Sequence, residues 1–91
     1  MTRVVVDVMP KPEILDPQGQ AIAQALPTLG CAGVRSVRQG KRFELEIDGV
    51  LTAAQRTDIE RIAASLLTNP VIEDFVLRIE DDDVVDTGRP R

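Results

Sequence analysis

The chain has 91 residues, which is enough for one domain with a modest core and too few for two. Its 15 acidic and 11 basic residues give a net charge of −4, which argues against nucleic acid and anionic membranes as partners. Histidine is missing and cysteine occurs once, so Ser–His–Asp and Cys–His catalysis, an internal disulfide and the usual nitrogen and sulfur metal sites are excluded.

The apolar composition sets the kind of core this chain can build. Phe43 and Phe75 are the only aromatic residues, so the core must consist of Val, Ile, Leu and Ala. A small aliphatic core is marginal alone, which favours a homodimer or a higher homo-oligomer. The sequence has neither a signal-peptide pattern nor a run of membrane-spanning length, and we expect a cytoplasmic protein.

A valine-rich strand and a stiff connection open the chain. Residues 3–9 predict a strand that carries apolar residues on both faces. The connection Lys11–Gly19 contains Pro12 and Pro17, whose rings fix the backbone angle φ. Asp16 is a good N-cap and the proline after it a good first helical residue, so a helix should begin here.

The first predicted helix covers residues 17–29. Its apolar positions form one stripe at helical spacing: Ala21, Ile22, Ala25, Leu26 and Leu29. Pro27 removes a backbone hydrogen bond, so the helix should kink or end near Leu26, with Gly30 or Gly33 completing the turn.

Two strands are predicted next, joined as a hairpin. Residues 34–38 suggest a short strand, and Gln39–Lys41 a turn in which Gly40 supplies positive φ. Residues 42–48 alternate strictly between apolar and charged side chains, which predicts a strand with one buried face and one wet face.

A second helix and a last strand complete the domain. Thr52 and Gln55 form a capping box at the helix start, and Asn69-Pro70 should stop the helix. Residues 72–80 predict the last strand. We therefore expect one α+β domain over residues 1–80, and a charged, disordered tail over residues 81–91.

The predicted order β-α-β-β-α-β is that of a ferredoxin-like α+β sandwich. Both helices have one apolar stripe, so both should cover the same face of an antiparallel sheet. The other face carries Glu44 and Glu46 beside Val5 and Met9. Such a mixed face suits either solvent or a sheet-mediated dimer.

No residue set predicts a catalytic, cofactor-binding or metal site. Glu44, Glu46 and Asp48 share a strand face, but a solvated face explains them better than a cation site. Cys31 has no histidine to activate it. A basic patch surrounds the predicted hairpin, where a phosphate or an acidic partner could dock: Arg35, Arg38, Lys41 and Arg42.

One combination of motifs resembles a known family. Lys11-Pro12 and Asp16-Pro17-x-Gly19 are followed, at a characteristic distance, by Val37-Arg38-x-Gly40-Lys41. Over residues 3–80 the chain resembles the small S subunit of phosphoribosylformylglycinamidine synthase, the PurS family. Pro27 departs from the pattern, and so does the charged tail.

The resemblance implies a non-catalytic assembly subunit in purine biosynthesis. It would bridge a glutaminase subunit and a large ATP-dependent synthetase subunit, form a dimer, and support ammonia transfer to formylglycinamide ribonucleotide. The complex would use ATP, magnesium and glutamine, none bound by this chain. The motif residues are then candidates for the partner interface: Lys11, Pro12, Asp16, Arg38 and Lys41. Gly19 and Gly40 would serve the backbone geometry.

A second hypothesis remains open at this point. Ferredoxin-like domains also act as small-molecule-binding regulatory modules, with a pocket at a helix–strand junction. An acylphosphatase-like reaction is less compatible, because Pro10-Lys11-Pro12 has too few backbone N–H groups to hold a phosphate.

Overall fold

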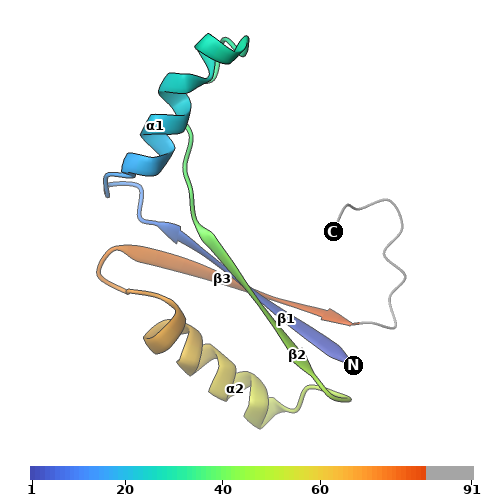
Figure 1. Cartoon of the computed structure of the whole chain (residues 1–91). Coiled ribbons are helices and arrows are strands. Elements are labelled where there is room, and N and C mark those ends of the chain that lie inside the picture. Colours follow the sequence, from blue (N-terminus) through green and yellow to red (C-terminus); the bar gives the residue numbers. More distant parts are fainter. Residues whose placement is uncertain (82–91) are drawn as a thin grey trace.

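A computed structural model describes residues 1–81, which form a small sheet, two α-helices and two short helical turns (Figure 1). The elements in chain order are β1 (Thr2–Pro10), α1 (Pro17–Ala25), the 3-10 turn η1 (Pro27–Leu29), β2 (Lys41–Ile47), α2 (Ala53–Ile62), the π-helical turn η2 (Ala63–Leu67) and β3 (Glu73–Asp81). The predicted tail lies outside the described residues from 82 onward, and its disorder stays a prediction.

The sheet is antiparallel, with strand order β2-β1-β3. Val6 at its centre lies opposite Phe43 on β2 and Leu77 on β3. Because side chains alternate along a strand, this row and every second row on either side of it face α2. The core formed there consists of fully buried valines of β1 and two residues of the α2–η2 helix: Val4, Val6, Val8, Ile59 and Ala63. The predicted antiparallel α+β fold is confirmed.

The other face of the sheet is lined by charged side chains. Arg78 of β3 pairs with Asp7 of β1 at 2.9 Å, and Arg3 lies 3.9 Å from Glu80. Val5 is fully buried although it points to this face. The predicted mixed face therefore carries ion pairs over the buried Val5, with Met9 and Val76 exposed beside them.

Both helices begin where the sequence predicts. Asp16 caps α1 at Gly19, and Thr52 exchanges both hydrogen bonds of the capping box with Gln55. The α1 helix stops at Ala25, Pro27 opens the 3-10 turn, and Gly30 closes it with φ of 89°. Among residues 1–81, no helix is long and apolar enough to span a bilayer.

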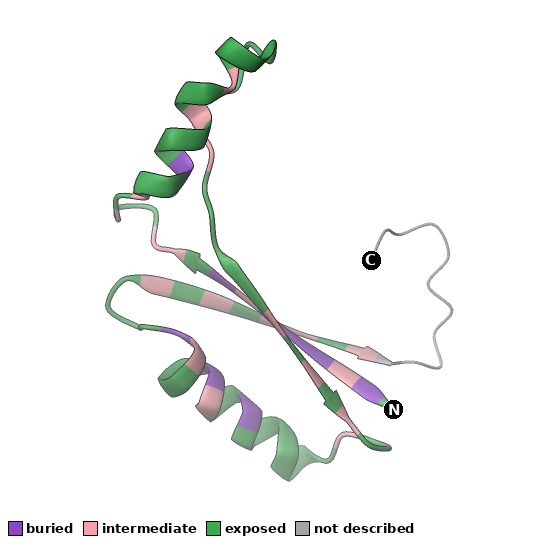
Figure 2. Ribbon diagram, in the orientation of Figure 1, coloured by how far each residue is buried: buried purple, intermediate pink, exposed green. Residues whose placement is uncertain are grey.

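The segment from α1 to Gly40 departs from the predicted arrangement. We call residues 17–40 the arm, because in Figure 1 the α1 helix lies beyond one end of the sheet while α2 lies along it. The apolar stripe of α1 therefore does not cover the sheet of its own chain. Figure 2 shows the arm almost wholly exposed. Ile22 is 38% and Leu29 77% exposed, although both were predicted to be packed.

The strand predicted over residues 34–38 is absent from the described chain, and so is the hairpin. The backbone of residues 32–38 makes no hydrogen bond to the rest of residues 1–81. Gly40 does not adopt positive φ, and the chain runs straight from the arm into β2. The prediction failed because a turn was assigned to a glycine that the chain uses for close packing.

Candidate functional site

The predicted interface residues lie around the base of the arm, where the chain leaves β1 and returns to β2. We call this region the arm junction and define it by Lys11, Asp16, Gly19, Arg38 and Gly40. The carboxylate of Asp16 connects the start of the arm to its end. One oxygen accepts the N–H of Gly19 at 2.9 Å, and the other accepts the N–H of Gln39 at 2.7 Å.

These two hydrogen bonds hold Asp16 in its charged form. The N–H of Gln39, and then that of Gly19, lower the pKa of the Asp16 carboxyl below its ordinary value of 3.8. Arg38 contributes in the same direction with its positive charge. Asp16, which the sequence predicts as a helix cap, thus also links two segments that are 23 positions apart.

Two glycines allow the backbones at the junction to touch. A Cβ atom on Gly19 would overlap the carbonyl oxygen of Val37 and lie 2.6 Å from Oδ2 of Asp16. A Cβ on Gly40 would overlap the carbonyl oxygen of Val8 in β1. Both glycines therefore serve backbone geometry, as the sequence suggested, but through close approach.

The basic residues of the junction contact their own chain. The guanidinium of Arg38 donates to the carbonyl oxygen of Pro10. The ammonium of Lys11 lies 2.6 Å from Asp74, and that hydrogen bond raises the pKa of Lys11 above 10.5. Lys41 lies 3.6 Å from Glu73. The two lysines thus fix the start of β3 to the base of the arm.

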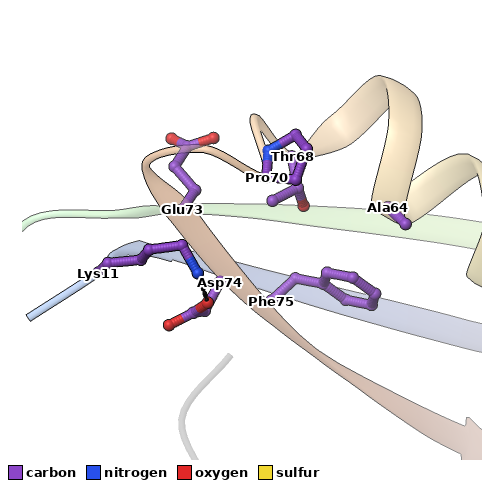
Figure 3. A pocket seen from close by; sticks show the side chains of 7 residues that line it. All are labelled: Lys11, Ala64, Thr68, Pro70, Glu73, Asp74 and Phe75. Carbon is purple, nitrogen blue, oxygen red and sulfur yellow. Dashed lines mark hydrogen bonds and ion pairs between the residues drawn. The ribbon is translucent and has the colours of Figure 1, made fainter.

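A shallow hollow of about 400 Å³ lies beside these ion pairs. Figure 3 shows Lys11 and Asp74 meeting on one side of it, while the ring of Phe75 extends toward Ala64. Thr68 also lines the hollow; it is 5% exposed, and its hydroxyl has no hydrogen-bond partner among residues 1–81. Thr68 is the C-cap that follows the π-helical turn.

The polar groups at the junction brace the chain against itself. Within residues 1–81, no three acidic, cysteine or histidine side chains gather as metal ligands. Cys31 is a free thiol on the exposed outer part of the arm. The polar groups of the junction instead hold backbone atoms and each other.

The structure brings together four of the five predicted interface residues through contacts within the chain: Lys11, Asp16, Arg38 and Lys41. Pro12 is exposed on the connection between them. Sequence reasoning missed the partners of these residues. Asp74 and Glu73 were indicated only by their charge, while the N–H of Gln39 and the carbonyl of Pro10 are backbone groups that no residue type reveals.

The stability that Asp16 contributes should depend on pH. Because its folded-state pKa is lowered, the contribution is fully present above 3.8 and is lost as the pH falls through the lowered value. Urea unfolding of the parent and of Asp16→Asn, followed by circular dichroism, should differ at pH 7 and converge in strong acid. A gap that stays constant with pH would show that the carboxylate charge is irrelevant.

The fold and the junction define a class: a small ferredoxin-like α+β protein whose charged groups brace a projecting arm. The family model "PurS: Phosphoribosylformylglycinamidine (FGAM) synthase" matches residues 3–81. A Mycobacterium leprae protein, phosphoribosylformylglycinamidine synthase subunit PurS, is 56% identical over 80 residues, covering 88% of this chain and 98% of the relative.

Solved structures agree with the sequence match. Bacillus subtilis PurS superimposes with a TM-score of 0.75 at 36% identity, covering 89% of this chain and all of that one. A structure of PurLQS from Thermotoga maritima gives 0.76 at 25% identity, covering 87% and 96%. The chain belongs to the PurS family of FGAM synthase subunits, as the motifs suggested. The regulatory-domain alternative is not favoured by these matches.

Proposed function

We propose that this chain is the assembly subunit of FGAM synthase, which holds a glutaminase subunit and an ATP-dependent synthetase subunit together. The observation that carries this proposal is the match to the PurS family over residues 3–81. The likeness to a chain in the Thermotoga maritima PurLQS structure adds support, since that name joins PurS to other components.

The shape of the chain is also consistent with a binding role. An arm that leaves apolar side chains in water presents surface for other proteins. Leu15 is 65% exposed beside Pro12, on the connection that leads into the arm. A shallow hollow of about 380 Å³ there includes Pro12, Asp16 and Arg38 in its lining.

We therefore retain the five motif residues as the proposed interface, with divided roles. Asp16 and Arg38 set the direction of the arm through their contacts with Gln39 and Pro10. Pro12 offers rigid exposed surface. Lys11 pairs with Asp74, and Lys41 pairs with Glu73. The positions of these four charges are therefore set within the chain before a partner binds.

The remaining parts of the proposal concern the complex. It would consume ATP and glutamine with magnesium, bound by the partner subunits, and pass ammonia to formylglycinamide ribonucleotide. The homodimer and the cytoplasmic location stay predictions from the sequence.

Reconstitution tests the proposed function. The purified chain alone should hydrolyse neither ATP nor glutamine. Added to both large subunits, it should be required for glutamine-dependent synthesis, while synthesis from added ammonium salts should depend on it much less. If omission of the chain leaves the glutamine-dependent rate unchanged, the assembly role is wrong.

A further inference from the structure

The basic patch predicted from the sequence is only partly used by the fold. Three of its four cations have partners inside the chain: Lys41 and Arg42 each pair with a carboxylate, and Arg38 donates to a carbonyl oxygen. Arg35 is exposed and forms no ion pair within residues 1–81. The charge of Arg35 is therefore left for something other than the fold.

The arm differs in charge from the rest of the chain. Residues 17–40 contain Arg35 and Arg38 and no acidic residue, whereas the whole chain has a net charge of −4. The potential around a protein is the sum over its charges, so the arm is the positive part of an acidic molecule. An anion is attracted to this segment and repelled by the remainder of the chain.

A hollow of about 320 Å³ lies between α1 and residues 34–40, which lead back to β2 and which we call the return segment. Figure 1 shows the return segment running beside α1. The polar side chains of the lining come from both sides: Gln20 and Gln24, one turn apart on α1, and Arg35 and Ser36 on the return segment. None of these four side chains makes a hydrogen bond within the described part of the chain.

The adjoining hollow at the base of the arm suits an anion less well. Its volume is about 380 Å³, and its lining includes the carboxylates of Glu13 and Asp16. Gln20 and Ser36 line both hollows, so the two adjoin along the seam between α1 and the return segment. An anion should therefore bind at the Arg35 end, where the lining contains no acidic side chain.

We propose that the hollow between α1 and the return segment binds a phosphate group, as the free ion or on a small phosphorylated molecule. The planar guanidinium of Arg35 can donate two parallel hydrogen bonds to two phosphate oxygens. The hydroxyl of Ser36 and the carboxamides of Gln20 and Gln24 can donate to the remaining oxygens. Donors from two elements suit a tetrahedral oxyanion better than a planar carboxylate, which offers only two oxygens. This site is independent of the synthase assignment, because it needs no partner subunit.

A titration of the isotope-labelled full chain, followed by NMR, tests the site. Sodium phosphate is added at pH 7 while sodium chloride keeps the ionic strength constant. The backbone amides of residues 20–24 and 34–37 should shift in a saturable way, and sodium acetate should need a higher concentration for the same shift. Glycerol 3-phosphate separates the two sources of the group: tighter binding than that of inorganic phosphate indicates a phosphorylated molecule, and equal or weaker binding indicates the free ion.

Replacing Arg35 tests whether the guanidinium holds the phosphate. Arg35→Gln should raise the dissociation constant for phosphate by about tenfold, because it removes the charge-assisted hydrogen bonds. Arg35→Lys keeps the charge without the planar fork and should lie between that variant and the parent. The matched control is Arg56→Gln, which removes the same charge from the exposed side of α2, where Arg56 pairs with Glu60; it should bind phosphate as the parent does.

Both substituted positions are exposed, so each variant should keep the dispersed spectrum of the folded parent. The proposal is overturned if the parent shows no saturable shift at tens of millimolar phosphate, or if the shifts spread evenly over the chain. Equal weakening by Arg35→Gln and Arg56→Gln would overturn it too, because net charge rather than the hollow would then govern binding.

Discussion

Replacing Gly40 with valine is expected to lower the free energy of unfolding by about 3 kcal/mol. The new side chain would collide with the carbonyl oxygen of Val8, a backbone atom in the central strand that cannot move aside cheaply. Urea unfolding of Gly40→Val, followed by circular dichroism at fixed protein concentration, measures the change.

The control for that variant is Gln39→Val, because Gln39 is the exposed neighbour and its contribution to the junction is a backbone N–H that valine retains. Gln39→Val should be close to the parent in stability. Equal stability of both valine variants would mean that the close approach of Gly40 to β1 is unimportant.

Replacing Ile22 with glutamate should weaken self-association by about 100-fold or more, equivalent to about 2.7 kcal/mol. In a single chain this side chain is exposed, so the substitution should cost little folding stability. In a homodimer that covers the apolar stripe of α1, the substitution would bury a carboxylate with no group to compensate its charge. Sedimentation equilibrium over a concentration series measures the dissociation constant.

Gln24→Glu is the charge-matched control on the same helix, since Gln24 lies about half a turn from Ile22. It should leave the dissociation constant nearly unchanged. If both variants dissociate equally, net charge rather than the α1 stripe governs assembly.

The parts of the fold that follow from local chemistry were predictable from the sequence. Asp16 and Thr52 each place an oxygen where the first helical N–H groups need one, so both helix starts are encoded within four residues. The alternation in β2 likewise fixes which side chains face α2. Such signals do not require knowledge of distant segments.

The direction of the arm was not predictable, because it depends on contacts between distant segments. A glycine between Gln39 and Lys41 has the same local pattern whether it turns the chain or allows a close approach to Val8. Residues 34–38 have strand character, but their sequence does not say whether the neighbouring strand belongs to the same chain.

The candidate site was predictable in its residues and not in its contacts. Four of the five motif residues lie around the arm junction, but Asp16 and Arg38 bind backbone groups there, and the two lysines pair with carboxylates more than 30 positions away in the sequence. A carbonyl such as that of Pro10 exists at every position, so its use as an acceptor becomes visible only in three dimensions.

The ion pairs on the open face of the sheet affect how this chain meets its surroundings. Arg78 is shared between Asp7 and Glu80, and Arg3 also lies near Glu80, so these four charges each have a neighbour of opposite sign. Removing water from these ion pairs costs free energy, unless a partner supplies hydrogen bonds that replace those to water. Face-to-face association of two copies through these ion pairs is therefore disfavoured, and apolar contact on this side is limited to the surroundings of Met9 and Val76.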